Sequence, residues 1–313
     1  MHAVLACVVR SGVTDSVHCG SAVAIDPQGL QVAAAGDPAG LVLPRSVLKP
    51  LQAVAMLRAG LVLDGAPLAL AASSHSGERF QLDGVARLLA SGGLQPDLLQ
   101  NTPDLPLDDA ERLAWQVAGR PASRIAQNCS GKHAAMLLTC RLNDWPVESY
   151  RDPGHPLQRA VAGTIAELTG EPVTVTAVDG CGAPAFGLSL TGLARAFARL
   201  AVAAPGTPER AVAEAIRRHP EWLGGTDRAV TRLLRAVPGL IAKDGAEAVF
   251  AAALPDGCAV AVKIGDGGRR PLLPVVVALL HRLWAGGEAL AELADVPVLG
   301  HGRRVGTVDV IGL

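Results

Sequence analysis

The stretch Arg45-Ser46-Val47-Leu48-Lys49-Pro50 marks the place where a strand pattern gives way to a helix pattern. Proline lacks a backbone N–H and fits only the first turn of a helix, so Pro50 predicts a helix that begins near Ser46. Four apolar residues then fall close to one face of a helix over Arg45–Leu61, namely Val47, Leu51, Val54 and Leu57. We therefore expect Ser46 at the positive end of the helix dipole, where developing negative charge is favoured.

Short apolar segments typical of strands lie on both sides of this region. Ala3–Val9, Ser21–Ile25 and Leu30–Ala35 predict a three-stranded meander, and Ala246–Leu254 and Cys258–Ile264 predict a later pair joined by a Pro-Asp-Gly turn. Helical spacing is found at Gln81–Ala90, Asp108–Val117, Gly131–Leu142, Leu157–Leu168, Leu188–Ala203, Thr207–Arg218 and Pro271–Trp284. The order predicts one α+β unit over residues 1–313, with sheet-forming parts at about 1–45 and 240–313 and a mainly helical middle at about 46–239.

Composition excludes several classes of function. Lys+Arg 28 balance Asp+Glu 29, so no excess of basic charge points to nucleic acid or an anionic membrane. Apolar runs such as Leu68–Ala72 and Pro274–Leu280 are far shorter than the roughly 20 residues of a membrane helix. The start, Met1-His2-Ala3-Val4, lacks the pattern of a secretory signal, and six scattered cysteines do not suggest a disulfide framework. We expect a cytoplasmic protein.

Lysine is unusually rare in this chain. Of the 28 basic residues 24 are arginine, and the four lysines are Lys49, Lys132, Lys243 and Lys263. Unlike arginine, lysine can lose its proton in a protein and then act as a base or a metal ligand, so these positions are candidates for chemistry. Lys243, ahead of a strand, and Lys263, inside one, could each point into a cleft beside Ser46, and the spacing does not rank them.

Ser46 and Lys49 form the first constellation that could carry chemistry. Residues three apart on a helix lie one turn apart on the same face, so the hydroxyl and the amine can touch. A neutral lysine there could take the serine proton and create a nucleophile without any histidine. The alternative is a helix-capping serine beside a solvated lysine.

A second candidate is Ser73-Ser74-His75-Ser76-Gly77-Glu78, a loop rich in hydroxyl groups directly after the apolar run Leu68–Ala72. A buried run that ends in small polar residues is a good position for a site loop. A simple helix cap, with His75 as a structural histidine, is the alternative.

The densest cluster is Asn128-Cys129-Ser130-Gly131-Lys132-His133, which opens an apolar helix. It has too few glycines for a phosphate loop, which leaves a Cys129–His133 nucleophilic pair or a metal site. A metal site needs a further ligand, and Asp179-Gly180-Cys181-Gly182-Ala183-Pro184 could supply one. A buried, inert cysteine is the default interpretation for each cysteine taken singly.

Together these motifs resemble the L-asparaginase II family over essentially the whole chain. The matching motifs are Arg45-Ser46-x-x-Lys49-Pro50, Ser74-His75-Ser76-Gly77-Glu78, Asn128-Cys129-Ser130-Gly131-Lys132-His133, Asp179-Gly180-Cys181, His219-Pro220-Glu221, Lys243-x-Gly245-Ala246-Glu247 and Lys263-Ile264-x-Asp266-Gly267. The resemblance implies a fold like that of β-lactamase and glutaminase, a mainly antiparallel sheet flanked by helices with a helical subdomain. It also implies hydrolysis of the side-chain amide of L-asparagine to aspartate and ammonia.

The resemblance further implies roles for individual residues. Ser46 and Lys49 would be the nucleophile and its base, and Ser74 and Lys243 would form a second serine–lysine pair in the same cleft. One zinc ion per chain, which would not be the direct catalyst, would be bound by Cys129, Lys132 and Cys181. Substrate would be contacted by Asp179, with Arg45, Ser130 and His133 as further candidates. The family likeness also implies a homodimer that acts on a small-molecule substrate.

Two residues depart from the family pattern. Ala248 stands where glycine is common after Gly-Ala-Glu, and His301 stands where asparagine is common. Neither belongs to the implied catalytic set, so the departures bear on substrate range more than on activity.

Three alternative functions stay open. A β-lactamase, D-alanyl peptidase or esterase would use the same serine–lysine chemistry, but those that act on the cell wall need export. A glutaminase is a closer alternative, because one extra methylene changes discrimination by only ~1–3 kcal/mol. A non-catalytic amino-acid sensor would keep the pocket, but it has no need of two intact serine–lysine pairs.

Overall fold

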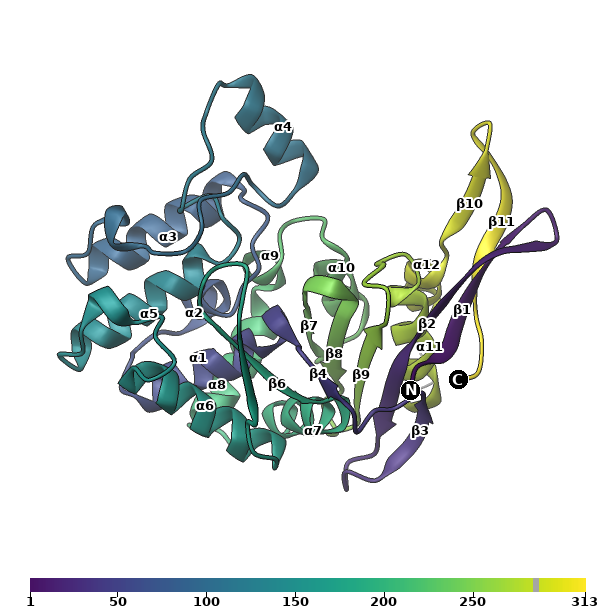
Figure 1. Cartoon of the computed structure of the whole chain (residues 1–313), viewed down its shortest axis with the longest axis horizontal. Helices are drawn as coiled ribbons and strands as arrows, with labels where there is room; N and C mark the ends of the chain where they lie inside the picture. Colours follow the sequence, from purple (N-terminus) through teal and green to yellow (C-terminus); the bar gives the residue numbers. More distant parts are fainter. Residues whose placement is uncertain (284–286) are drawn as a thin grey trace.

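The computed structural model describes residues 1–283 and 287–313 (Figure 1). The strands are β1 (Ala3–Arg10), β2 (Val13–Ile25), β3 (Gln31–Ala35), β4 (Leu41–Val42), β5 (Val175–Val178), β6 (Pro184–Ser189), β7 (Ile241–Asp244), β8 (Val249–Ala253), β9 (Ala259–Ile264), β10 (Pro297–Gly300) and β11 (Arg303–Val310). The α-helices are α1 (Lys49–Arg58), α2 (Gly65–Ala71), α3 (Arg79–Ser91), α4 (Asp109–Val117), α5 (Ser130–Leu142), α6 (Pro156–Thr169), α7 (Leu190–Ala201), α8 (Pro208–Arg218), α9 (Pro220–Leu223), α10 (Ala229–Ala236), α11 (Leu272–Leu283) and α12 (Glu288–Ala294). Short 3₁₀ turns are η1 (Arg45–Leu48), η2 (Pro96–Leu98), η3 (Val147–Ser149) and η4 (Ala246–Ala248).

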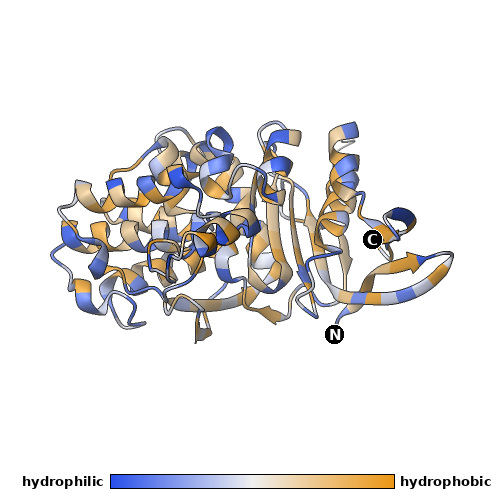
Figure 2. Cartoon of the chain, turned by 90° about the horizontal axis from the view of Figure 1, so that it is seen from above, coloured by the Kyte–Doolittle hydropathy of each residue, from blue (hydrophilic) through white to orange (hydrophobic). Residues whose placement is uncertain are grey.

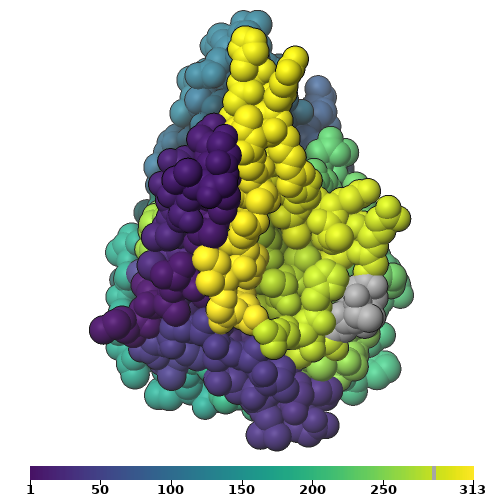
Figure 3. Space-filling view, turned by 90° about the vertical axis from the view of Figure 1, so that its right-hand side faces the viewer, coloured from purple at the N-terminus to yellow at the C-terminus, as the bar shows by residue number. Residues whose placement is uncertain are grey.

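The main sheet joins the two ends of the chain. Its strand order is β10-β11-β1-β2-β9-β8-β7, and β3 pairs with the second half of β2. Every pairing in it is antiparallel. Figure 3 shows the result on one face, where the purple N-terminal strands lie beside the yellow C-terminal ones.

Helices cover both faces of the sheet at its centre. Helix α7 packs on β2, β8 and β9, and α11 packs on β2, β9 and β11. All residues of β8 and almost all of β9 are buried, as strands covered on both faces must be. In Figure 2 these strands are largely coloured as hydrophobic and lie between the helical part and the long outer hairpins.

The helical part follows the sheet's first strands and carries a second, smaller sheet. Helices α1, α5, α6 and α8 pack on one another, and β4-β6-β5 form a small antiparallel sheet beside them. The α+β class, with a mainly antiparallel sheet flanked by helices and a helical subdomain, is confirmed. No helix in the described ranges is both long and apolar enough to cross a membrane.

Several predicted boundaries need correction. The helix expected over Arg45–Leu61 begins as the turn η1, and regular α-helix starts only at Lys49 and ends at Arg58. The helix expected from Leu188 begins two residues later, because Leu188 and Ser189 end strand β6 and the Ser189 hydroxyl caps the Gly192 N–H at 2.8 Å. The last apolar helix is described over Leu272–Leu283, and its expected final residue, Trp284, lies outside the described residues, so this boundary stays a prediction.

Candidate active site

A polar pocket of about 390 Å³ brings together the segments that the sequence singled out. It lies where η1, the start of α5, the turn between β5 and β6, and the turn after β7 meet. Its lining residues are Arg45, Ser46, Thr102, Pro103, Asp104, Gln127, Asn128, Cys129, Asp179, Gly180, Cys181 and Ala246. Its volume suits a small molecule.

Ser46 and Lys49 differ in their access to the pocket. Ser46 is half-buried in the pocket wall, whereas Lys49, the first residue of α1, is buried and does not line the pocket. Pro50 lies in the first turn of α1, where its missing N–H costs no helical bond, as expected. Arg45 has a φ of 54°, a left-handed backbone conformation that non-glycine residues adopt rarely and mostly at functional positions.

The amine of Lys49 is directed at the loop that follows α2. Its Nζ donates to the Ser73 carbonyl oxygen at 2.6 Å and to Ser74 Oγ at 3.0 Å. In the part of the chain that the structure describes, these are its hydrogen bonds, and none joins it to Ser46. Ser74 is only 5% exposed, so it lies beneath the pocket with Lys49.

Close packing between α2 and α5 joins this loop to the Asn128–His133 segment. The His75 N–H donates to the Asn128 carbonyl oxygen at 3.1 Å. A Cβ on Gly131 would stand 2.4 Å from the Leu70 carbonyl oxygen, so only glycine allows the two helices to approach this closely. His75 Nε2 and Ser130 Oγ are 2.8 Å apart across the same contact. Burial, helped by the charge of Lys49, lowers the pKa of His75 to about 3, which makes it a neutral structural residue.

Cys129, Lys132 and Cys181 meet in one buried cluster. Lys132 Nζ lies 3.4 Å from Cys181 Sγ, and the Cys129 thiol donates to Asn128 Oδ1 at 3.2 Å. Interaction with Cys181, together with burial, raises the pKa of Cys129 to about 12, and interaction with Cys129 lowers the pKa of Cys181 to about 5. Burial would lower the pKa of Lys132, but Cys181 and Cys129 outweigh it, so the pKa is raised. The arrangement is a buried lysine beside two free cysteines.

Asp179 and Arg45 form an ion pair at the mouth of the pocket. Arg45 Nε lies 2.5 Å from Asp179 Oδ1, and the Gly180 N–H donates to the same oxygen at 2.8 Å. Burial alone would raise the pKa of Asp179, but the charges of Lys132 and Arg45 outweigh it and lower the pKa. A charged carboxylate and a guanidinium at one pocket wall can bind the two charged groups of an amino acid.

Ser130 and His133 are buried behind the pocket rather than in its wall. Ser130 Oγ donates to the Ile125 carbonyl oxygen at 2.8 Å. His133 Nδ1 lies 2.7 Å from the Tyr150 hydroxyl, and burial lowers the pKa of this histidine well below its usual value. Neither residue lines the pocket, so the structure places both as supports of α5.

Lys243 lies fully buried on β7, which packs against η1, the turn that carries Ser46. Its Nζ donates to the Asp244 carbonyl oxygen at 2.7 Å and to Asp244 Oδ1 at 2.9 Å. Burial lowers the pKa of Lys243 to about 8, although Asp244 opposes the shift. A Cβ on Gly245 would stand 2.7 Å from the Pro44 carbonyl oxygen, so this glycine lets β7 approach η1. No hydrogen bond between Lys243 and Ser74 is present in the described ranges.

Lys263 belongs to a neighbouring pocket. It donates to the Glu247 carbonyl oxygen and, with His2, Arg45 and Glu247, lines a hollow of about 310 Å³. The two lysines that the spacing could not rank are therefore separated by burial, because Lys263 is partly exposed and Lys243 is not.

Residues 6–310 match the family model described as L-asparaginase II. The chain belongs to the L-asparaginase II family. The match covers nearly the whole chain. No curated protein sequence matches it.

Solved structures similar to this L-asparaginase II family member have low sequence identity. Mglu in its tris and glutamate form is 15% identical, with a TM-score of 0.45, over 84% of this chain and 58% of that one, so the family member spans less than two thirds of Mglu. A β-lactamase from Mycobacterium bovis is 18% identical, with a TM-score of 0.43, over 83% and 93% of the two chains. A Bacillus glutaminase in 4.3 M NaCl is 13% identical, with a TM-score of 0.36, over 88% and 89%.

Sequence reasoning missed part of the site of this asparaginase II chain. The pocket wall formed by Thr102, Pro103 and Asp104 lies in a loop without apolar periodicity, so nothing marked it. Asp244, the partner of Lys243, could have been noticed only as its immediate neighbour in the chain.

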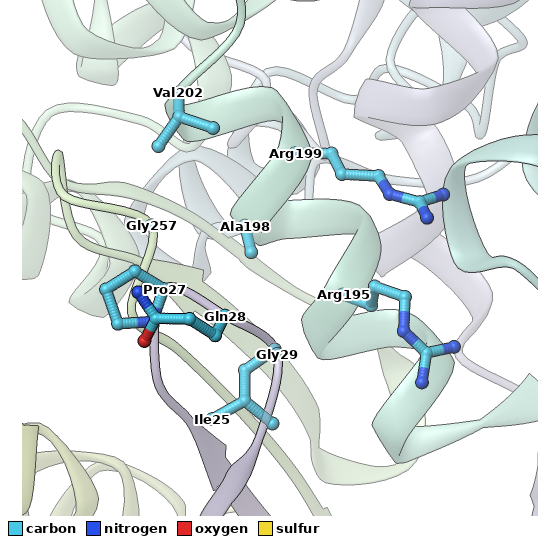
Figure 4. A pocket seen from close by; sticks show the side chains of 9 residues that line it. All are labelled: Ile25, Pro27, Gln28, Gly29, Arg195, Ala198, Arg199, Val202 and Gly257. Atoms are coloured by element: carbon cyan, nitrogen blue, oxygen red, sulfur yellow. The ribbon is translucent and has the colours of Figure 1, made fainter.

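A further pocket of about 340 Å³ shares no residue with the site. Figure 4 shows Arg195 and Arg199 of α7 extending away from the Pro27–Gly29 loop that forms its other wall. Arg195 donates to the Thr169 carbonyl oxygen, and Arg199 donates to that of Leu168, at 2.8 and 2.9 Å. Both arginines therefore cap the end of α6, which accounts for them structurally.

Proposed function

We propose that this chain hydrolyses the side-chain amide of L-asparagine to aspartate and ammonia through a serine-bound acyl intermediate. The observation that carries the proposal is a half-buried serine in the pocket wall, Ser46, three residues before the buried Lys49 and on the turn η1, which packs against the strand of the buried Lys243. Burial lowers the pKa of Lys243 to about 8, and a buried lysine that loses its proton can serve as the base of a serine–lysine hydrolase. The Arg45–Asp179 pair supports an amino-acid substrate, because its two charges complement an α-carboxylate and an α-amino group.

In the proposed reaction Ser46 attacks the amide carbon while its proton passes to Lys49. Backbone N–H groups near Ser46 stabilise the oxyanion, in a site that precedes the N-terminus of α1. Ammonia leaves with a proton relayed through Ser74 and the two lysines, for which the 3.0 Å contact between Lys49 and Ser74 provides a path. Water then attacks the ester and releases aspartate, and Ser46 regains its proton.

We further propose that Cys129, Lys132 and Cys181 hold one zinc ion. In tetrahedral zinc sites a nitrogen and a sulfur ligand are about 3.6 Å apart, and the 3.4 Å between Lys132 Nζ and Cys181 Sγ fits this. In the described residues no cluster of three His, Cys, Asp or Glu side chains could hold a metal, so the lysine is essential to the proposed set. Bound zinc would compensate the thiolate charge and tie the β5–β6 turn to α5, and its binding must release the proton of Lys132.

Glutamine hydrolysis is the second candidate function. The pocket volume of about 390 Å³ also has room for glutamine. The extra methylene of glutamine is worth only ~1–3 kcal/mol in discrimination. We also propose, by likeness to the family alone, a homodimer in the cytoplasm, which light scattering of the purified protein and fractionation of the source cells would test.

Ammonia release from L-asparagine and L-glutamine tests the proposal. Wild type, Ser46→Ala, Ser74→Ala and the surface control Ser16→Ala are compared after each variant is shown to be folded. Release from asparagine that is lost in Ser46→Ala and kept in Ser16→Ala supports the substrate and the nucleophile. Release that survives in Ser46→Ala and is lost in Ser74→Ala moves the nucleophile to Ser74. No release from either amide by folded, zinc-loaded protein contradicts the proposal and favours the sensor.

A further inference from the structure

Asp244, at the end of β7, makes ion pairs with three cations at once. Its Oδ1 accepts from Lys243 Nζ at 2.9 Å, and its Oδ2 accepts from Arg228 at 2.8 Å and from Arg269 at 2.5 Å. The Asp244 side chain is only 7% exposed, Arg228 lies before α10, and Arg269 lies before α11. The two arginines therefore fix the carboxylate from one side while the lysine binds it from the other.

The geometry leaves Lys243 with one free direction. A neutral amine has two N–H donors and one lone pair. Among the described residues, the acceptors that bind Lys243 Nζ both belong to Asp244, the carbonyl oxygen at 2.7 Å and Oδ1 at 2.9 Å. When both N–H groups are used there, the lone pair points away from Asp244 and is available to accept a proton.

We propose that Asp244, held by Arg228 and Arg269, is a positioning residue that orients the Lys243 amine and sets its proton affinity. The inference rests on the proposed function, because it gives the proton relay through Lys243 a defined direction. Asp244 itself touches neither the pocket nor the reacting atoms.

The charges around Lys243 support this assignment. Asp244 favours the charged lysine, whereas Lys49 and Arg228 disfavour it, and burial lowers its pKa to about 8. The buried residues of α7, α8 and β8, which also pack on β7, are apolar, and Arg45 of η1 is paired with Asp179. The charges near Lys243 that substitutions can change are therefore the Asp244 carboxylate and the two arginines that bind it.

Nuclear magnetic resonance of lysine-labelled protein tests the inference without any substrate. The chain has only four lysines, so the ¹³Cε signal of Lys243 is assigned from the Lys243→Met variant. Arg228→Gln removes a nearby cation and should raise the apparent pKa of Lys243 by ~0.5–1 unit, and Arg269→Gln should raise it by less. Asp244→Asn should lower it by ~1 unit or more.

Arg79→Gln is the matched control. It removes a surface ion pair away from Lys243, between Arg79 and Asp83 at 3.0 Å, and should leave the Lys243 signal unmoved. Arg269 is 53% exposed, so its variant remains informative if Asp244→Asn does not fold. A Lys243 titration unchanged in both arginine variants overturns the inference.

The pH dependence of ammonia release separates this inference from the proposed function. If both hold, the acidic limb of the rate profile moves in the same direction as the Lys243 titration, and Arg269→Lys restores part of the wild-type profile. If the Lys243 pKa shifts in the arginine variants but the protein has no asparaginase activity, the role of Asp244 is supported and the proposed function is contradicted. If the protein is active but the Lys243 pKa does not shift, the proposed function is supported and the role of Asp244 is overturned.

Discussion

Lys49 Nζ lies 3.0 Å from Ser74 Oγ and 2.6 Å from the Ser73 carbonyl oxygen, although Ser46 is only three residues before it in the chain. The acceptors in the loop after α2 account for this direction. Ser46 lies in a 3₁₀ turn, in which residues three apart eclipse, and Lys49 begins the α-helix, so the backbone alone would put the two side chains on one face. The bonds to Ser73 and Ser74 direct the Lys49 amine to the buried loop after α2.

Lys49→Arg should lower kcat/KM for asparagine by at least ~10³-fold, because arginine keeps its proton and cannot act as a base. Lys263→Arg is the matched control, since this lysine is partly exposed and binds a carbonyl oxygen, which arginine can also do. Steady-state ammonia release measures both. An equal loss of kcat/KM in the two variants would contradict a specific role of Lys49 as the base.

The rate should rise with pH through about 8. Only neutral Lys243 can accept a proton, and its pKa is lowered to about 8, so kcat/KM climbs as this lysine loses its charge. The measurement is kcat/KM for asparagine from pH 6 to 9.5. A profile that is flat between pH 7 and 9 would argue against Lys243 in the relay.

Stability should respond to the same group. The pKa of about 8 in the folded protein lies below the ordinary lysine value of 10.5, so the unfolded chain binds more protons between these pH values. Charged Lys243 therefore destabilises the fold below pH 8. Between pH 8 and 10.5 the free energy of unfolding rises with pH, by up to ~1.4 kcal/mol per pH unit. Urea unfolding of wild type and Lys243→Met at pH 7 and pH 9 should show this gain in wild type only. A gain of the same size in Lys243→Met would assign it to other groups.

Sequence periodicity predicted the elements whose pattern is local and failed where structure depends on distant contacts. Strands β1 and β3 and helices α3, α5 and α6 were anticipated within a few residues, whereas β2 begins at Val13, eight residues before its predicted start at Ser21. Strands β7 and β10 are only four residues each and become strands through pairing with β8 and β11. The smaller sheet of β4, β5 and β6 was missed for the same reason.

For the candidate site too, local sequence patterns predicted some features, and contacts between distant segments determined the others. Scarcity of lysine and short motifs indicated Ser46, Lys49, Cys129 and Lys243, and the fold brings all their segments together. Which lysine touches which serine could not be predicted, because it depends on packing between α1, α2 and β7. The departures at Ala248 and His301 illustrate a backbone effect, since their φ angles are 51° and 47° and neither lines the pocket.

Zinc removal should lower thermal stability. Purified protein should contain about one zinc per chain, and stripping it should lower Tm in proportion to the binding free energy lost. Cys181→Ser and Lys132→Arg should both reduce bound zinc by at least ~10-fold, because serine binds zinc weakly and arginine cannot lose its proton. Elemental analysis and calorimetry measure this, with Cys19→Ser on β2 as the control. Full zinc content in Cys181→Ser would remove Cys181 from the ligand set.

The hairpin between β10 and β11 offers a test of the backbone argument away from the site. Gly300 pairs with Arg303, so His301 and Gly302 form a two-residue turn with φ angles of 47° and 74°, as in a type I′ turn. Asparagine followed by glycine is the preferred pair in such turns, so His301→Asn should stabilise the fold by about 0.5 kcal/mol. His301→Val should destabilise it by about 1–2 kcal/mol, because a β-branched residue tolerates positive φ poorly. Both residues are exposed, so urea unfolding reports the turn itself, and activity should not change. Equal midpoints for the asparagine and valine variants would show that this turn does not contribute to the stability of the sheet.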